Sequence, residues 1–291
     1  MPGAQPRVSV VIPAYRNADF VAETIESVLA QTFTDYELVL ADHSSDDGTQ
    51  TILERYASDP HVRLLEPTPA GGGAQRNWNR VSEAASGEYL KLLPADDLLA
   101  PRALAVQVAA LDAHPDAVLA ASNRAMITDT GAVLIANRGL PASLVGAHDA
   151  ATAVRTTVRA GTNVFGEPGA VLLRRSALER AGWWDGRSGY AIDVQSYVNT
   201  LAYGGMVGID EVLSSFRISA QQWSVRLASS QASEMAEVFR GFRAAHPTWV
   251  SATDVRLGSA KAWASAMGRR AVYIALDLIR RVRDGRASRA A

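Results

Sequence analysis

Apolar positions in the first hundred residues follow two alternating patterns. Short runs in which nearly every residue is apolar are typical of buried strands, and segments with apolar residues three and four positions apart are typical of helices. The predicted strands are 8–12, 36–41, 62–66 and 88–93, and the predicted helices between them are 19–31, 49–57 and 71–85. Strands separated by helices usually pair in parallel through right-handed crossovers. The pattern predicts an α/β fold with a mostly parallel sheet flanked by helices.

The pattern becomes less regular after residue 100, and residues 136–165 give no decisive signal. The predicted elements are a helix at 101–113, a strand at 117–122, a hairpin over 126–135, strands at 169–173 and 206–217, helices at 176–181 and 192–203, and helical segments at 221–245 and 255–283. No repeat or low-complexity linker separates them. We predict one main domain over residues 1–220, followed by a C-terminal helical extension over residues 221–291.

Composition agrees with a globular chain and excludes several classes of protein. The 291 residues are 48% hydrophobic with a net charge of −1, which excludes a disordered chain. No run of 18 apolar residues predicts a transmembrane helix, and no charged leader precedes the first strand, so we expect a cytoplasmic protein. The absence of cysteine excludes disulfides, cysteine-bound zinc and a thiol nucleophile.

Charge is distributed unevenly along the chain. Residues 255–291 hold nine basic and two acidic residues, a formal charge of +7, which leaves −8 for residues 1–254. A basic tail on an acidic body is unlike a nucleic-acid-binding fold. The tail also carries an apolar helical stripe made of Trp263, Met267, Ala271, Ile274, Leu278 and Val282. This stripe fits three alternatives: an anionic membrane surface at the inner face of the cell membrane, core packing, or a dimer contact.

Polar residues follow three of the predicted strands directly. Tyr15 and Arg16 follow the first, the segment 42–49 follows the second, and Asp96 and Asp97 follow the fourth. Ligands of parallel sheets bind at these carboxyl ends. Carboxylates gathered there repel one another, and a divalent metal that holds a phosphorylated ligand would relieve that repulsion.

Two blocks of sequence carry a family resemblance. VSVVIPAYRNADFVAETIESVLAQTFTDYELVLADHSSDDGT resembles the opening of family 2 glycosyltransferases, and GGGAQRNWNRVSEAASGEYLKLLPADDLLAP resembles their second block with its acidic DXD-type motif. The resemblance covers residues 7–217. It implies a GT-A fold with a nucleotide-sugar half over about 1–115 and an acceptor half over about 116–220. The implied activity is inverting transfer from a UDP-type donor to an acceptor hydroxyl in bacterial cell-surface glycan or glycoconjugate synthesis.

The resemblance assigns the first strand ends to the nucleotide base. Asp42 would accept a hydrogen bond from a uracil-type base, beside the backbone of Pro13 and Ala14 and the ring of Tyr15. The alternatives are that Asp42 caps the following turn and that Tyr15 packs under the sheet edge. His43 stands where the family usually has an acidic residue, and we interpret it as a lone surface histidine.

The second block adds further donor contacts. Arg76 and Asn77 match an A-R-N segment near the nucleotide; Arg76 would bind base or phosphate, or form a structural ion pair. The glycines 71–73 would let the backbone approach a phosphate, or simply form a flexible turn. Asp47 is expected to cap the helix that begins near Thr49.

Asp97 carries the metal assignment. By resemblance, Asp97 ligates Mg2+ or Mn2+ and Asp96 binds the donor ribose or supports the metal. The family often has D-x-D-D here, and Pro94 replaces the first acid in this chain. The alternative is an aspartate pair that caps the helix starting at Pro101.

A third block, beginning NVFGEPGAVLLRRSALERAGWWDGRSGYAIDVQ, resembles the acceptor region of the family. Asp193 stands at the position of the catalytic base, and its rivals are Asp185 and Glu167. Glu167 is also expected to line the pocket of a glycan or lipid-linked acceptor. Trp184 would stack on a sugar ring or fill the core.

Two departures from the family leave other functions open. Ser219 replaces the histidine of a terminal Y-R-x-H segment, and Ile192 precedes Asp193 where a second acid is common. A non-catalytic protein that binds a nucleotide sugar or glycan is therefore the alternative. A nucleotidyltransferase is a further rival, but the Gly-rich loop with lysine that it needs after the first strand is missing.

Overall fold

A computed structural model describes residues 5–68, 71–218 and 231–267. Its centre is a ten-stranded sheet whose main path has the order β3-β2-β1-β4-β9-β6-β10-β5, with β7 paired to β6 and β8 to β10. The strands are β1 (Val8–Ala14), β2 (Tyr36–Asp42), β3 (Val62–Leu64), β4 (Tyr89–Leu92), β5 (Leu98–Leu99), β6 (Ala117–Thr128), β7 (Val133–Arg138), β8 (Gly146–His148), β9 (Val171–Arg174) and β10 (Gly205–Ile218).

Two parallel blocks meet in this sheet. Strands β3, β2, β1 and β4 form one block, and β6 pairs in parallel with β10 to form the other. Strand β9 lies between the blocks and is antiparallel to both β4 and β6. The predicted α/β class with a mostly parallel sheet is confirmed, and the antiparallel β9 brings the segment that precedes it to the middle of the sheet.

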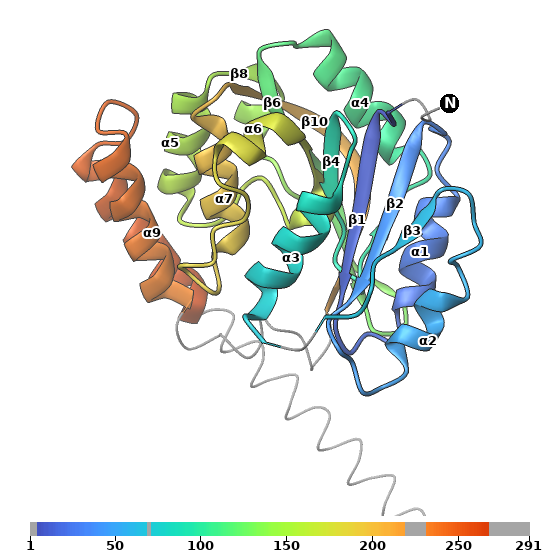
Figure 1. Ribbon diagram of the computed structural model, residues 1–291. Helices are drawn as coiled ribbons and strands as arrows, with labels where there is room; N and C mark the ends of the chain where they lie inside the picture. The colour runs from blue at the N-terminus through green and yellow to red at the C-terminus, as the bar shows by residue number, and fades with distance from the viewer. Residues whose placement is uncertain (1–4, 69–70, 219–230, 268–291) are drawn as a thin grey trace, which may run out of the picture.

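Helices cover both faces of the sheet (Figure 1). They are α1 (Val21–Leu29), α2 (Thr49–Glu54), α3 (Gly73–Ala84), α4 (Ala103–Ala113), α5 (Ala150–Ala160), α6 (Arg175–Arg180), α7 (Ile192–Leu201) and α9 (Gln231–Ala245). Alternate residues of a strand point to opposite faces, so Val10 packs in the core under α1 and α4 while Val11 packs in the core under α3 and α7. Both faces are buried, which explains the nearly continuous apolar runs of β1 and β2.

The less regular half of the chain differs from expectation in detail. The predicted strand at 117–122 and the first arm of the predicted hairpin form one long strand, β6. Residues 136–165, which gave no decisive pattern, contain β8 and α5. The last predicted helix is present over 252–267, and its remaining predicted residues lie outside the described part of the chain.

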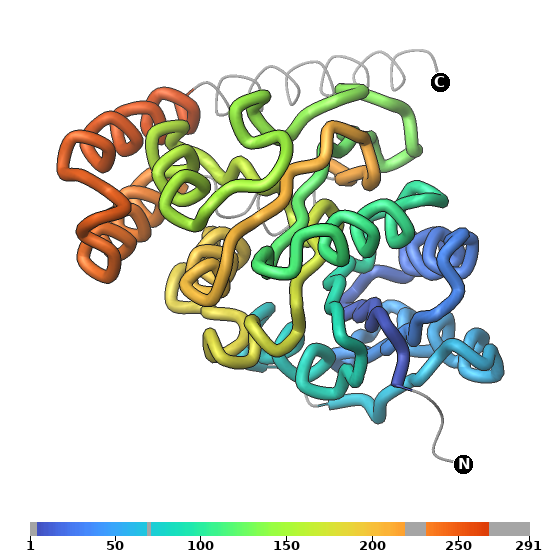
Figure 2. Tube along the Cα trace, turned by 90° about the horizontal axis from the view of Figure 1, so that it is seen from above, coloured from blue at the N-terminus to red at the C-terminus, as the bar shows by residue number. Residues whose placement is uncertain are grey.

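The described part of the C-terminal extension packs against α5. Phe239 of α9 and Val255 of the helix over 252–267 belong to the buried core. Gly161 and Gly258 allow α5 and the helix over 252–267 to approach each other closely. A methyl group at Gly258 would lie 1.9 Å from the carbonyl oxygen of Val158 in α5. In Figure 2 this extension lies at one end of the molecule, far from α1 and α2.

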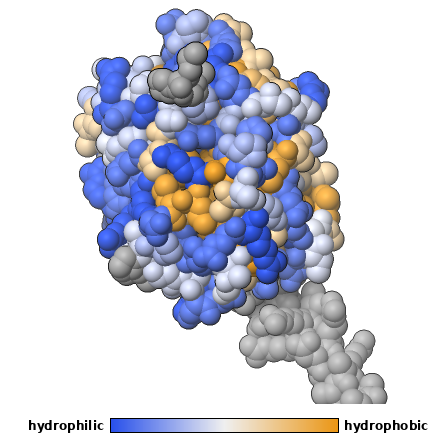
Figure 3. Space-filling model, turned by 45° about the vertical axis from the view of Figure 1, so that its right-hand side comes forward, coloured by the Kyte–Doolittle hydropathy of each residue, from blue (hydrophilic) through white to orange (hydrophobic). Residues whose placement is uncertain are grey.

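The apolar stripe of the tail is described only at its beginning. Trp263 is 53% exposed and Met267 is 72% exposed, so neither side chain packs in the core of the described residues. Residues 271–282 of the stripe lie outside the described chain. Within the described ranges, no helix combines the length and the apolar character that a membrane span requires. Figure 3 shows a surface that is largely hydrophilic on the side it presents, with apolar residues gathered near its centre.

Candidate active site

The carboxyl ends of β1 and β2 form the first part of the site. The register places Ala14 opposite Asp42, so the residues that follow each strand emerge side by side. The carbonyl oxygen of Ala14 accepts hydrogen bonds from the His43 backbone N–H at 3.0 Å and from Asn77 Nδ2 at 3.2 Å. The end of β1 is therefore fixed by residues from β2 and α3.

Asp42 is buried and caps its own turn. Its Oδ2 accepts the backbone N–H of Ser45 at 2.8 Å, and its Oδ1 accepts the Ser45 hydroxyl at 2.5 Å. The turn-capping alternative is thus present in the structure. An ionised carboxylate has about four acceptor positions, so contact between Asp42 and a nucleotide base stays a prediction.

The side chain of Tyr15 is exposed and that of His43 is buried. Tyr15 is 45% exposed and does not pack under the sheet edge, and the guanidinium of Arg16 lies 5.5 Å from the centre of its ring. His43 is 5% exposed, so the interpretation of a lone surface histidine is wrong. Its Nδ1 lies 3.2 Å from Thr68 Oγ1 and its Nε2 lies 2.9 Å from the Gly71 carbonyl oxygen. His43 therefore ties the end of β2 to the glycine loop.

The glycine loop enters α3 in a conformation that other residues adopt poorly. Gly71, Gly72 and Gly73 have φ angles of 128°, 76° and 62°. Arg76 follows on the first turn of α3 and is exposed, and Asn77 is buried. The structural ion pair considered for Arg76 is not found among the described residues. Asp47 Oδ1 accepts the backbone N–H of Thr49, the first residue of α2, at 3.0 Å, although the N-cap residue of that helix is Gly48 and not Asp47.

Asp96 and Asp97 follow β4 at the centre of the same edge. Asp97 is 1% exposed, and its Oδ1 accepts the backbone N–H of Arg217 at 2.9 Å. Burial and the neighbouring charge of Asp96 raise the pKa of Asp97 well above its usual range, against the effect of the Arg217 N–H. A buried carboxyl with a raised pKa beside a second carboxyl is the electrostatic situation that a divalent cation relieves. Asp97 accepts this backbone N–H from β10 instead of capping the following helix.

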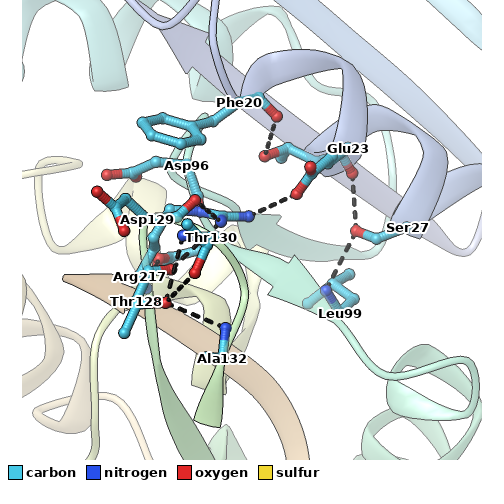
Figure 4. A network of polar contacts seen from close by, with 12 residues as sticks. Phe20, Glu23, Ser27, Asp96, Leu99, Thr128, Asp129, Thr130, Ala132 and Arg217 are labelled. Carbon is cyan, nitrogen blue, oxygen red and sulfur yellow. Dashed lines mark hydrogen bonds and ion pairs between the residues drawn. The ribbon is translucent and has the colours of Figure 1, made fainter. Parts of the chain in front are cut away.

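Arg217 joins the loop of Asp96 and Asp97 to two other segments, the start of α1 and the turn after β6 (Figure 4). Its Nε donates to the Asp96 carbonyl oxygen at 2.9 Å, and its Nη1 donates to the Asp129 carbonyl oxygen at 2.9 Å. Its Nη2 donates to Glu23 Oε2 at 2.7 Å, and the guanidinium lies 4.7 Å from the centre of the Phe20 ring. The side chain of Arg217 is 1% exposed. Its position fixes the loop that carries both aspartates.

A partly buried ion pair joins β6 to the segment before β9. Arg124 of β6 bonds to both carboxylate oxygens of Glu167, with Nη2 3.0 Å from Oε1 and Nε against Oε2. The side chain of Arg124 is 6% exposed and that of Glu167 is 27% exposed. The charges of both residues act on Asp97 and on Asp193. The same ion pair therefore acts on both Asp97 and the expected base, Asp193.

Asp193 opens α7 beside this ion pair. Its Oδ2 accepts Asn163 Nδ2 at 2.8 Å, and its Oδ1 accepts the backbone N–H of Val194 at 2.6 Å. Burial raises the pKa of Asp193 to about 7; the Val194 and Asn163 donors and Arg124 oppose the shift, and Glu167 adds to it. A carboxyl whose pKa lies near neutrality is suited to accept a proton in general base catalysis.

The remaining acceptor candidates take structural positions. Trp184 is 1% exposed, and its Nε1 donates to Ser82 Oγ at 2.8 Å, so the acceptor-binding expectation for Trp184 is corrected to core packing. Asp185 accepts Arg187 Nε at 3.0 Å and Asn199 Nδ2 at 3.3 Å. The Arg187 bond is the largest cause that lowers the pKa of Asp185. A carboxylate paired in this way is a weaker base than Asp193.

Three buried polar side chains hold the segment after Glu167. Lys91 Nζ donates to the carbonyl oxygens of Gly169 at 2.8 Å and Val171 at 3.1 Å. The residue between Gly169 and Val171 is Ala170. Its carbonyl oxygen accepts hydrogen bonds from Gln107 Nε2 at 2.8 Å and from Ser122 Oγ at 3.1 Å. Burial lowers the pKa of Lys91 to about 7. We call this set (Lys91, Gln107 and Ser122) the carbonyl clamp.

The clamp places the segment that follows Glu167 against Asp97. A methyl group at Gly169 would lie 3.8 Å from Asp97 Oδ2 and 3.2 Å from the Leu93 side chain. The interior of the sheet thus fixes the distance between the acceptor side and Asp97. Sequence reasoning missed Lys91, although a lysine inside an apolar strand pattern signals a buried partner.

Comparison with known proteins identifies the architecture. A family model described as "Glycosyl transferase family 2" matches residues 9–182. The chain belongs to glycosyl transferase family 2. The match contains β1, β2, β4 and the loop of Asp96 and Asp97, and it ends before Asp193.

Relatives and solved structures agree with the family. The chain is 38% identical over 96 residues to YibD, an uncharacterized glycosyltransferase of Escherichia coli, a match that covers 33% of this chain and 27% of YibD. It is 33% identical over 93 residues to the glycosyltransferase GlyG of Streptococcus pneumoniae, covering 32% of this chain and 31% of GlyG. The matched segments thus span less than one third of either relative.

Two glycosyltransferase structures share the GT-A fold. TarS 1–349 of S. aureus in complex with UDP-GlcNAc has a TM-score of 0.63 at 19% identity and covers 82% of this chain and 66% of that one. The mannosyltransferase PcManGT from Pyrobaculum calidifontis, in complex with GDP-Man and Mn2+, has a TM-score of 0.60 at 19% identity and covers 95% of this chain and 82% of that one. At this identity the likeness concerns the fold.

Proposed function

We propose that this family 2 glycosyltransferase moves a sugar from a UDP-type nucleotide sugar to an acceptor hydroxyl with inversion. The observation that carries the proposal is that two carboxyls with raised pKa values both experience the charges of the Arg124–Glu167 pair. Asp97, buried beside Asp96, suits a cation-bound diphosphate, and Asp193, with a pKa of about 7, suits a base. Leaving group and base are both needed for direct displacement.

The donor would lie across the ends of β1, β2 and β4. Pro13, Ala14 and Asp42 would contact the base, with the exposed ring of Tyr15 beside them. Arg76 is exposed at the start of α3 and would bind base or phosphate, and Asn77 fixes Ala14 behind it. A solved neighbour of this fold, TarS, was crystallised with UDP-GlcNAc, which supports the UDP preference by analogy.

The donor set fits a divalent cation of the magnesium class. The described residues contain no group of three or more His, Cys, Asp and Glu side chains that could hold a metal. Magnesium-type sites often use one or two carboxylates together with phosphate and water, which Asp97 and Asp96 satisfy. When bound, Mg2+ or Mn2+ supplies positive charge that stabilises the departing nucleoside diphosphate. The analogy with PcManGT, crystallised with Mn2+, points the same way.

Asp193 would take the proton of the acceptor hydroxyl as that oxygen attacks the anomeric carbon. The bond from the anomeric carbon to the diphosphate breaks in the same step, and the configuration inverts. Glu167, which is 27% exposed beside Asp193, would line the acceptor pocket. Asp185 remains a rival base, although its hydrogen bond with Arg187 lowers its pKa and so makes it a weaker base.

The acceptor is proposed to be a glycan or lipid-linked saccharide in bacterial cell-surface synthesis. A peripheral membrane contact through residues 255–291 belongs to the same proposal, supported by their charge of +7 and by the exposure of Trp263 and Met267. The cytoplasmic location and the domain boundaries stay predictions.

A donor screen tests the proposed activity. The full chain is incubated with UDP-, GDP- and dTDP-sugars and Mn2+, with water as the acceptor of the sugar, and release of the nucleoside diphosphate by hydrolysis is measured. We expect UDP release from at least one UDP-sugar, dependent on a divalent metal, and inversion at the anomeric carbon by NMR. Binding of the sugar nucleotide without any release would favour the non-catalytic binder instead.

A further inference from the structure

The loop before Glu167 presents an asparagine to the expected base. Asn163 Nδ2 donates to Asp193 Oδ2 at 2.8 Å and to the Gly166 carbonyl oxygen at 2.8 Å. Asn163 Oδ1 accepts the backbone N–H of Phe165 at 2.9 Å. These three bonds join the Asn163 amide to two atoms of its own turn and to one oxygen of the Asp193 carboxyl group.

The orientation of this amide follows from its partners. The Phe165 N–H can only donate and the Gly166 carbonyl can only accept, so the oxygen and nitrogen of the Asn163 amide cannot be exchanged. Both N–H groups of Nδ2 are then used, one within the turn and one toward Asp193. Asn163 is therefore held rigidly with a donor aimed at Asp193.

Asp193 is held from its other side by its own helix. The Val194 N–H donates to Oδ1, so the two carboxylate oxygens are fixed by donors from two different segments. The charged groups that face Asp193 are Glu167 from the preceding loop and Arg124 from β6, and Tyr197 lies one turn along α7. Asn163 is a neutral donor in this set, so it orients the carboxyl without adding charge.

We propose that Asn163 is a positioning residue that orients Asp193 and favours its ionised form for proton removal from the acceptor. The inference rests on the proposed function, because it assigns a role to the base of that reaction. A base that is oriented by a third group is a recurring arrangement in enzymes that move protons.

Two variants separate orientation from a general structural effect. Asn163→Ala removes the donor to Asp193 together with the two bonds of its turn, and Asn163→Asp keeps the size of the side chain while replacing a donor by a carboxylate. The matched control is Asn199→Ala on α7, the helix of Asp193, which removes an amide donor from the rival carboxylate Asp185. Circular dichroism and thermal unfolding establish that each full-length variant is folded.

The test is the pH profile of UDP release from the UDP-sugar that turns over fastest. We expect Asn163→Ala to lower kcat and to shift the acid limb of its pH profile by about one unit toward higher pH. The reason is that the ionised Asp193 carboxylate loses one hydrogen-bond donor. Asn163→Asp moves the acid limb further, and Asn199→Ala leaves it in place. An equal loss of kcat at every pH in Asn163→Ala would overturn the proposal.

A second readout separates this proposal from the proposed function. Carbon-13 NMR of labelled aspartate, assigned with Asp193→Asn, follows the carboxyl titration without any catalysis. We expect its midpoint to rise in Asn163→Ala. An unchanged midpoint overturns the contact itself. A raised midpoint together with an unchanged kinetic pH profile overturns the role of Asn163 in catalysis. If Asp193→Asn is also fully active, Asp193 is not the base and the proposed function loses that assignment.

Discussion

At the ends of β1, β2 and β4, the donor-side residues follow their strands directly, and neighbouring strands bring them together. On the acceptor side, Arg124, Asn163 and Asp193 come from a strand, a loop and a helix that are far apart in the sequence. Parallel pairing of adjacent strands is enough to assemble the first group. The second group depends on β9, which enters the sheet antiparallel between the two parallel blocks.

The carboxyls of the site also differ in what stabilises or destabilises their charged form. Asp42 and Asp47 are stabilised by short-range donors of their own turns. Asp97 is buried and Asp193 is half-buried, and loss of contact with water is the largest cause that raises the pKa of each. Raised pKa values thus occur at the two carboxyls on which the charges of Arg124 and Glu167 act, whereas the turn after β2 satisfies its own aspartates, Asp42 and Asp47.

The largest effect is expected for Asp97→Asn. We expect a loss of UDP release of about 10³-fold or more, since a metal-bound leaving group contributes several kcal/mol. The folded protein should nevertheless become more stable without metal. The pKa of Asp97 is raised on folding, so its ionisation costs stability as pH rises from the usual aspartate range toward the raised value.

Asp47→Asn is the matched control for this stability effect. The pKa of Asp47 is lowered, chiefly because the Thr49 and Ala18 donors outweigh burial. Its ionised form therefore adds stability above the usual aspartate range, and that stability is lost as pH falls through the folded pKa. Thermal unfolding at pH 5 and pH 8 should show Asp97→Asn gaining and Asp47→Asn losing stability at pH 8. Equal behaviour of the two variants would contradict the comparison.

The next effect concerns the carbonyl clamp. Lys91→Met leaves two buried carbonyl oxygens without their donor, and we expect a loss of about 1–3 kcal/mol in the free energy of unfolding at pH 9. The folded pKa of Lys91, about 7, lies below its usual value. Wild-type stability relative to Lys91→Met should therefore rise between pH 7 and pH 10, by at most about 1.4 kcal/mol per pH unit.

Urea unfolding at pH 7 and pH 9 measures this difference. If the difference in free energy of unfolding between the wild type and Lys91→Met is the same at both pH values, the amine of Lys91 does not have the lowered pKa that burial gives it. If Lys91→Met lowers kcat while the affinity for the nucleotide sugar stays unchanged, the clamp acts on the acceptor side of the reaction.

The smallest effect is expected in the glycine loop. Gly72 has a φ of 76°, and a methyl group there would lie 2.7 Å from the Arg76 side chain. Gly72→Ala should cost about 1–2 kcal/mol of stability and weaken UDP binding several-fold. The control is Gly241→Ala in α9, where an added methyl group meets nothing within 4 Å among the described residues. It should gain up to about 1 kcal/mol. Urea unfolding and UDP calorimetry check both variants, and equal stabilities would contradict the account.

Much of the donor side could be predicted from sequence. The strand and helix periodicity located β1, β2, β4 and the acidic residues behind them, because burial on both faces leaves a strong apolar pattern. The predicted exposure of His43 was wrong, since its partner Gly71 belongs to a loop that local pattern does not connect to β2.

The acceptor side was less accessible to sequence reasoning. Asp193 was named from a family resemblance, but Asn163 lies in the segment that gave no pattern, and Arg124 stands inside a strand. Their roles appear only when β9 has joined the two parallel blocks, a contact that no local periodicity encodes. Trp184 shows the opposite error: an aromatic turn suggested sugar stacking, and packing against α3 and α7 buried the ring.

The most direct measurement compares binding and turnover in Asp193→Asn, with Asp185→Asn as control. Calorimetry with UDP and Mn2+ should give wild-type affinity for both variants, because neither residue lies on the donor side. UDP release from the sugar nucleotide should fall about 10²–10⁴-fold in Asp193→Asn. It should stay near the wild-type rate in Asp185→Asn. Normal turnover by Asp193→Asn would contradict the claim that the acceptor half supplies the base to a donor held by the other half.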